Sequence, residues 1–157
     1  ANASSGGELV VNGGFEGSVS PWTLSGSAFW STGGNHRSGT GYSILGAGNN
    51  ASGSEYQTVT IPAGHPANLT FWLNITTSES LTTAYDFMYV EVRSTSGALL
   101  GTLGSFSNRN AVSAPNAYTQ RSFSLAAWRG QAVRLQFRGT TDVTLPTSFR
   151  IDDVSLS

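Results

Sequence analysis

The stretch Leu69-Thr70-Phe71-Trp72-Leu73-Asn74-Ile75 decides the fold class of this chain. Every second residue from Leu69 to Ile75 is large and apolar. Because successive side chains of a β-strand point to opposite faces, these apolar residues would share one face, and Trp72 would lie on the other with its polar neighbours. The stretch therefore predicts a β-strand with one face in a hydrophobic core.

Two further stretches, residues 87–93 and 133–138, repeat this alternation, with apolar side chains inward and charged or aromatic ones outward. Weaker strand signals cover residues 9–16, 41–45, 55–61, 99–105, 120–125 and 149–156. Gly-, Pro- and Asn-rich turns separate these roughly nine strands, and no window keeps the 3.6-residue period of an amphipathic helix. The sequence predicts an all-β fold, a two-sheet antiparallel β-sandwich or jelly roll.

Size and composition narrow the class of protein. A chain of 157 residues can bury about two thirds of its unfolded surface, and we expect a linker over residues 1–7 and a single jelly-roll accessory domain over residues 8–157. Net charge is −1 and charged residues make up 11%, so no nucleic-acid surface is expected. No apolar run approaches the ~20 residues of a membrane span. The Ser-, Thr- and Gly-rich composition is typical of exported bacterial proteins, and we expect a secreted monomer.

Acidic residues stand near both ends of the predicted domain. Glu16 follows a turn, and Asp152 and Asp153 lie in the last strand. If the two ends are neighbours, three carboxylates converge, and like charges that close repel one another unless a hard cation such as calcium lies between them. Alternation cannot decide between Asp152 and Asp153, because a β-bulge there would swap their faces.

An ordered set of motifs covers nearly the whole chain from Glu8 onward. The motifs are NGGFE (12–16), HRSGTGYSILG (36–46), YQTVTIPAG (56–64), LTFWL (69–73), YDFMYVEV (85–92), RGQAVRLQFRGTTD (129–142) and TSFRIDDVSL (147–156). The set resembles the galactose-binding-like jelly-roll modules that include several families of carbohydrate-binding domains. It most resembles the non-catalytic C-terminal domain of secreted bacterial serine peptidases of the subtilisin and sedolisin type.

This resemblance implies a structural calcium ion between the first and last strands. It places Asp152 ahead of Asp153 as a ligand and adds main-chain oxygens from the neighbouring turns. The implied metal site comprises Glu16, Asp152, Asn12, Gly14 and Ser38, with Asp153 as the alternative carboxylate.

Two other acids, Asp86 and Asp142, lie next to predicted strands. They could form a second cation site or a hydrogen-bonded loop clamp. Capping of turns is the favoured interpretation, because an aspartate side chain readily accepts nearby backbone N–H groups.

The outward faces of the three clearest strands carry a candidate ligand-binding surface. Aromatic rings can stack on the apolar side of a sugar while Arg, Gln and Glu reach its hydroxyl groups. Alternatively, a loop covers the outward Trp72, and the charged side chains only pair with one another across strands. The candidate residues are Trp72, Tyr89, Glu91, Arg134, Gln136 and Arg138.

The sequence offers no support for catalysis. It has no cysteine and no Gly-x-Ser-x-Gly motif, and neither histidine lies in a nucleophile or zinc motif. We therefore expect a non-catalytic, calcium-stabilised accessory domain of a secreted hydrolase, with a serine peptidase as the parent implied by the resemblance. It would stabilise the parent or recruit it to a polysaccharide or protein substrate. The alternatives are a carbohydrate-binding module and a protein-interaction or adhesion domain.

Overall fold

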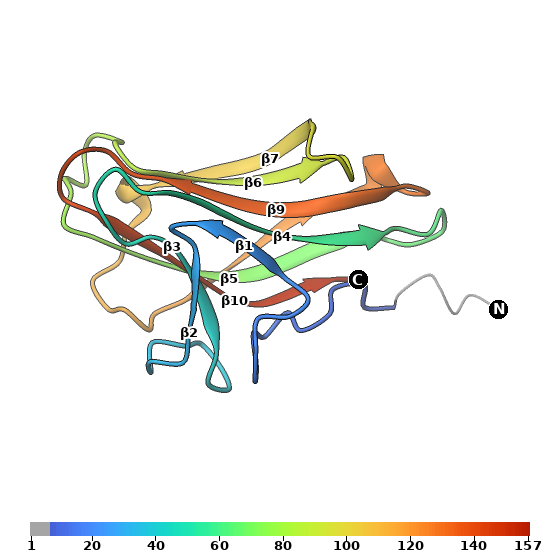
Figure 1. Cartoon of the computed structure of the whole chain (residues 1–157), viewed down its shortest axis with the longest axis horizontal. Coiled ribbons are helices and arrows are strands. Elements are labelled where there is room, and N and C mark those ends of the chain that lie inside the picture. Colours follow the sequence, from blue (N-terminus) through green and yellow to red (C-terminus); the bar gives the residue numbers. More distant parts are fainter. Residues whose placement is uncertain (1–6) are drawn as a thin grey trace.

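The computed structural model describes residues 7–157, so the expected linker lies outside the described residues except for Gly7. Two five-stranded sheets face each other (Figure 1). Sheet A has the strand order β1-β4-β9-β6-β7 and sheet B the order β2-β3-β10-β5-β8, with antiparallel pairing throughout. The predicted two-sheet antiparallel β-sandwich is confirmed. The strands are β1 (Thr23–Gly26), β2 (Phe29–Ser31), β3 (Tyr42–Gly46), β4 (Ser52–Thr60), β5 (Asn68–Thr77), β6 (Phe87–Arg93), β7 (Leu99–Ser107), β8 (Thr119–Ser124), β9 (Ala132–Thr140) and β10 (Thr147–Leu156).

The described residues include two short 3-10 helices, Asn108–Asn110 and Ala126–Trp128. No helix among these residues is long and apolar enough to cross a membrane. The C-terminus lies at one end of the sandwich, and the loops of residues 47–51, 78–86 and 141–146 lie at the other (Figure 1). We call this second end the loop end.

The core lies between the sheets, where alternating side chains of both meet. Phe71 of β5 packs against Phe137 of β9, with ring centroids 4.9 Å apart. Burial of one such side chain stabilises the fold by about 1.5–3 kcal/mol. The predicted inward residues of the three clearest strands are all buried: Leu69, Phe71, Leu73, Ile75, Met88, Val90, Val92, Val133, Leu135 and Phe137.

The two ends of the described chain lie side by side, but the first of them is not a strand. The Leu9 N–H donates to the Leu156 carbonyl at 2.9 Å, and the Val154 N–H donates to the Gly13 carbonyl at 2.9 Å. The strand predicted over residues 9–16 is wrong, because Asn12 and Phe15 have φ values of 52° and 54°, which interrupt an extended backbone. The segment is a series of turns packed beside β10.

Sequence reasoning also missed β1 and β2. Both are short, and their exposed or half-exposed residues show no apolar alternation. β1 is an edge strand of sheet A, and β2 is an edge strand of sheet B. The local sequence does not indicate a strand at either place. β1 and β2 are strands because they pair with β4 and β3, respectively.

One carboxyl group lies in the core. Glu55 of β4 points inward and is fully buried. The Ser43 hydroxyl donates to its Oε1 at 2.7 Å, while Oε2 has no partner within the described chain. Burial raises the pKa of Glu55 from 4.5 to about 8, and the hydrogen bond from Ser43 opposes this rise. The folded protein therefore keeps Glu55 protonated at neutral pH.

We predict that this group makes the protein less stable as the pH rises. The folded state holds the proton up to a pKa of about 8, whereas the unfolded chain loses it above 4.5. The free energy of unfolding should therefore fall between these pH values, by roughly 3–5 kcal/mol for this group. Glu55→Gln should remove this part of the pH dependence in urea denaturation between pH 4 and 9. If the free energy of unfolding changes equally with pH in the variant and in the parent protein, the prediction is wrong.

Candidate functional site

The acidic pair of β10 lies at a β-bulge. The register between β10 and β5 shifts between Asp152 and Ser155, and Asp153 has a φ of 51°. A bulge inserts an extra residue and re-aims the side chain that follows it. Both aspartates consequently reach one loop, residues 35–41, instead of opposite faces of sheet B.

Asp152 is satisfied mainly by backbone N–H groups. Its Oδ2 accepts the N–H groups of Arg37 and Ser38 at 2.9 and 3.1 Å, and its Oδ1 accepts the Asp153 N–H at 2.8 Å. Burial raises the pKa of Asp152 to about 6, although the Ser38 N–H bond opposes this change. Asp153 accepts the Ser38 hydroxyl and forms an ion pair with Arg37 at 3.1 Å.

Glu16 fixes the other part of the same loop. Its Oε1 accepts the Thr40 N–H at 2.9 Å, and its Oε2 accepts the Gly41 N–H at 3.0 Å. The hydrogen bonds from Gly41 and Thr40 lower the pKa of Glu16. Glycine is required at position 41, because a Cβ atom there would collide with the Phe15 carbonyl oxygen.

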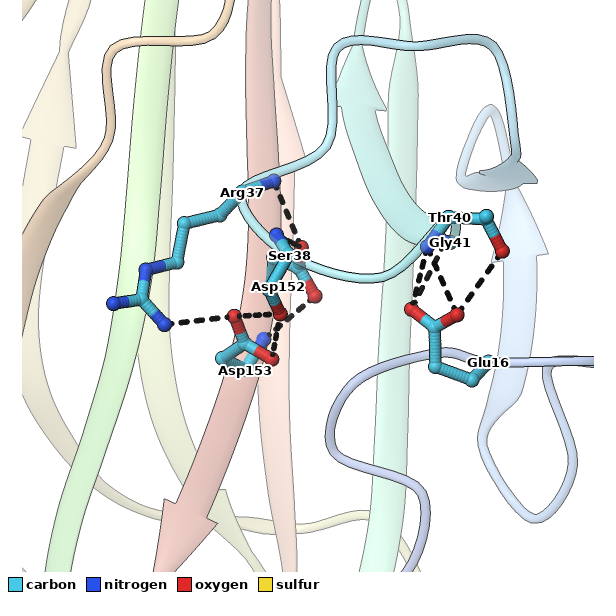
Figure 2. Close-up of polar contacts among 7 residues, drawn as sticks. All are labelled: Glu16, Arg37, Ser38, Thr40, Gly41, Asp152 and Asp153. Carbon is cyan, nitrogen blue, oxygen red and sulfur yellow. Dashed lines mark hydrogen bonds and ion pairs between the residues drawn. The ribbon is translucent and has the colours of Figure 1, made fainter.

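The three carboxylates therefore do not converge. Figure 2 shows Glu16 and the Asp152–Asp153 pair at separate parts of the loop, each with its own donors. Within residues 7–157, they are not a group of three acids whose ligand atoms lie within 4.8 Å of one another. Both oxygens of Glu16 and of Asp152 already accept N–H groups. This arrangement does not fit a calcium ion bound by all three acids, and the predicted convergence is wrong.

The other predicted ligands, Asn12 and Gly14, lie next to these carboxylates. The Asn12 carbonyl accepts the Trp22 indole N–H at 3.0 Å, and its side-chain Oδ1 accepts the Glu16 N–H at 2.9 Å. Gly14 lies between Glu16 and Asp153, since a Cβ atom on it would be 3.6 Å from Glu16 Cγ and 3.5 Å from Asp153 Oδ1. The structure thus brings the six predicted residues to one region, where the three carboxylates hold the loop that contains Ser38.

A different acidic group lies at the loop end. Within residues 7–157, Glu79, Asp86 and Asp142 are the acids whose ligand atoms lie within 4.8 Å of one another, and they could hold a metal ion. Asp86 is fully buried and accepts the Asp142 N–H at 2.9 Å. Glu79 Oε2 is buried without a hydrogen-bond partner in the described chain. Burial raises the pKa of Glu79, and Asp142 raises it further.

Sequence reasoning singled out Asp86 and Asp142 but missed Glu79. The loop of residues 78–86 folds back because Asn108 bridges it, accepting the Tyr85 N–H at 2.8 Å and donating to the Thr83 carbonyl at 2.8 Å. No alternation or motif around Glu79 signals that return.

A pocket of about 280 Å³ opens beside this acidic group. Its wall combines apolar and polar side chains, and further apolar side chains stand exposed on the neighbouring loops. Thr77, Glu79, Leu81, Ala111, Val112 and Ser113 line the pocket. The exposed apolar residues of this end are Leu81, Tyr85, Val112, Val143 and Leu145.

Five of the six predicted ligand residues gather on the outer face of sheet A. Glu91 lies at its centre, almost completely buried among the side chains of this face. Its Oε1 pairs with Arg93 at 2.9 Å, and its Oε2 pairs with Arg138 at 3.0 Å. Thr58 and Thr60 at the margin of this face are exposed, so it borders solvent. The five are Tyr89, Glu91, Arg134, Gln136 and Arg138, and Arg93 and Tyr56 join them.

Trp72 does not belong to this surface. It lies on β5 of sheet B, on the opposite side of the sandwich, so its predicted grouping with Tyr89 is wrong. The Arg37 guanidinium covers its ring at 3.8 Å from the centroid. Loop residues also lie over this side of sheet B, since the Asn74 amide donates to the carbonyls of Ala114 and Ala117 at 2.9 and 3.0 Å.

The aromatic rings of the sheet A face are not open platforms either. The guanidinium carbon of Arg138 lies 4.4 Å from the centroid of the Tyr89 ring, and that of Arg134 lies 4.2 Å from the centroid of the Tyr56 ring. One side of each ring is therefore covered by a cation. The surface offers planar guanidinium groups and polar side chains to a ligand.

Comparison with solved structures finds β-sandwich domains of the same size. TmCBM61, a carbohydrate-binding module solved with beta-1,4-galactotriose, matches with a TM-score of 0.69 and 17% identity, over 96% of this chain and 98% of the other. The K3 adhesin domain of Lys-gingipain from Porphyromonas gingivalis matches with a TM-score of 0.66 and 16% identity, over 96% of this chain and 99% of the other. The CBM22-1 xylan-binding domain of Paenibacillus barcinonensis Xyn10C matches with a TM-score of 0.60 and 12% identity, over 97% of this chain and 94% of the other.

The TM-scores show a common fold, and at these low identities they show the fold alone. Comparisons with protein-family models and with curated protein sequences gave no match.

We predict that Asp152 contributes more to stability than Asp153. In the parent protein, both carboxylate oxygens of Asp152 accept backbone N–H groups. Asp152→Asn leaves one side-chain oxygen, so a buried N–H group loses its acceptor at a cost of about 1–3 kcal/mol. Asp153→Asn weakens a partly exposed ion pair and should cost less than about 1 kcal/mol. Urea denaturation in the presence of a chelator measures both variants. A larger loss for Asp153→Asn would contradict this account of the loop.

Proposed function

We propose that this chain is a non-catalytic accessory domain that binds carbohydrate through the outer face of sheet A. The observation that carries the proposal is the convergence of Tyr89, Glu91, Arg134, Gln136 and Arg138 from neighbouring strands on a face that borders solvent. The opposite face, on sheet B, is overlaid by loop residues and by Arg37.

The chemistry of this face suits a polyhydroxylated ligand. Arginine and glutamine donate several N–H groups in fixed planes, and the Tyr89 hydroxyl can donate or accept. Glu91 holds Arg93 and Arg138 through ion pairs at 2.9 and 3.0 Å, which limits the freedom that these side chains would lose on binding. A preorganised polar face of this kind can bind a ligand that offers many hydroxyl groups at a low cost in side-chain ordering.

The solved structures support the same proposal. TmCBM61 was solved with beta-1,4-galactotriose, CBM22-1 is a xylan-binding domain, and the gingipain domain is an adhesin. The sequence resemblance adds a secreted hydrolase, specifically a serine peptidase, as the parent. In that setting the domain over residues 8–157 would act as a monomer that keeps its parent near a polymeric substrate.

A second candidate is adhesion to a protein through the loop end. It is favoured by the exposed apolar side chains there, which include Leu81, Val143 and Leu145. Clustered exposed apolar groups are typical of protein-interaction sites. The two candidates use different ends and faces of the sandwich, so variants separate them.

We predict that polysaccharide retention depends on sheet A and not on Trp72. Tyr89→Ala combined with Arg138→Ala removes two contacts of the binding face and should weaken retention by an insoluble polysaccharide about tenfold or more. Trp72→Ala should retain the parent affinity because it lies on the other sheet. A pull-down over a panel of polysaccharides measures this, with melting temperatures confirming that each variant folds.

Loss of retention in Trp72→Ala with normal retention in the double variant would contradict the proposed face. Retention that is lost only in Leu81→Ser or Val143→Ser would favour the loop end instead.

We further propose that calcium stabilises the domain at Glu79, Asp86 and Asp142. Hard cations prefer carboxylate oxygens, and an ion here would reduce the repulsion among three close acids. Calcium should then raise the melting temperature of the parent protein and of Asp152→Asn, but not that of Asp142→Asn, since ligands that bind only the folded state stabilise it. Thermal melts with calcium and with a chelator measure this. If the calcium effect persists in Asp142→Asn but disappears in Glu16→Gln, the proposed site is wrong and calcium binds near the chain ends instead.

A further inference from the structure

The outer face of sheet A has a charge unlike that of the whole chain. It carries three arginines, Arg93, Arg134 and Arg138, and one acid, Glu91, which gives a formal charge of +2 from three minus one. The whole chain has a net charge of −1. The other acids lie in the core, at the loop end or beside the 35–41 loop and the chain ends: Glu8, Glu16, Glu55, Glu79, Asp86, Asp142, Asp152 and Asp153.

Glu91 neutralises only part of this face. Its two oxygens are engaged by Arg93 and Arg138, and Gln136 reaches Oε1 at 3.4 Å. Arg134 stands directly opposite Arg93 in the pairing of β6 with β9. Like charges at opposite positions of an antiparallel pair repel each other, so an added anion would relieve this contact.

Arg134 is the group that an external anion would meet. Within residues 7–157 its guanidinium has no ion pair or hydrogen bond, and its buried Nε–H lacks an acceptor. The guanidinium carbon lies over the Tyr56 ring, 4.2 Å from its centroid. Contact with the ring holds the guanidinium in place, and its terminal N–H groups have no hydrogen-bond partner in the described chain; a guanidinium of this kind pairs well with a carboxylate.

The position of the arginines indicates an extended ligand. Arg134 and Arg138 are four residues apart on β9, which places their backbones about 13 Å apart along the strand. One monosaccharide does not span that separation, whereas a polysaccharide chain lying along the strand does. Because cations cover one side of Tyr56 and of Tyr89, charge complementarity outweighs ring stacking on this face.

We propose that the sheet A face selects an anionic polysaccharide, one whose sugars carry uronic-acid carboxylates, with Arg134 as its main carboxylate contact. This inference rests on the proposed function and adds the class of sugar to it.

The test compares polygalacturonate with the same polymer after methyl esterification, which removes the charge and keeps the sugar backbone. The parent protein should bind the acidic polymer at least about tenfold more tightly, and higher salt should reduce this difference. Arg134→Gln should weaken binding of the acidic polymer about tenfold and binding of the ester by clearly less, because only the acidic polymer loses a carboxylate contact. Arg109→Gln changes an exposed arginine of the 3-10 helix between β7 and β8; it is the matched control and should bind as the parent does.

Equal binding of the acid and the ester, unaffected by salt, would overturn the charge preference but leave the proposed carbohydrate binding intact. Selective binding of the acid that survives in Arg134→Gln would overturn the assignment of Arg134. No retention by either polymer or by any neutral polysaccharide would overturn both this inference and the proposed function. The salt and ester comparisons use the parent protein, so they decide the charge preference even if a variant does not fold.

Discussion

The two-residue alternation of β4, β9 and β6 is the constraint on which the rest of the structure depends. Val59, Val133, Leu135, Phe137, Met88, Val90 and Val92 of these strands are buried in the core, where Phe137 meets Phe71 of the facing sheet. The intervening side chains are then fixed on the outer face of sheet A whatever their chemistry. On β9 these are Arg134, Gln136 and Arg138. The requirement for a core therefore also determines which charged groups form the candidate binding face.

The carboxylates near the chain ends have a structural role: they hold a loop beside sheet B, and this makes the outer face of sheet B different from that of sheet A. Glu16 and Asp152 accept backbone N–H groups of the 35–41 loop and hold it beside sheet B. This position brings Arg37 over Trp72. Sheet B is thus overlaid by loops, and sheet A carries the polar surface that borders solvent. Backbone donors supply the neutralisation that a cation between the chain ends would otherwise provide.

Strand alternation in the sequence predicts the sandwich, its inward residues and most of the outer face of sheet A. Alternation indicates which side of its own strand a residue occupies, but not the sheet to which the strand belongs. It therefore does not distinguish Trp72 on sheet B from Tyr89 on sheet A. Contacts made by loops were also hidden. Glu79 lies close to Asp86 in a loop that Asn108 bridges through hydrogen bonds. Glu55 breaks the pattern, since its inward position places a carboxyl group in the core.

The most direct measurement of the central claim is a map of backbone and arginine side-chain chemical shifts by nuclear magnetic resonance during titration with an acidic oligosaccharide. The account predicts saturable changes centred on Tyr56, Tyr89, Arg134 and Arg138, with residues of sheet B and of the 35–41 loop unaffected. Changes confined to the loop end around Leu81 and Val143, or to Trp72 and Arg37, would contradict it.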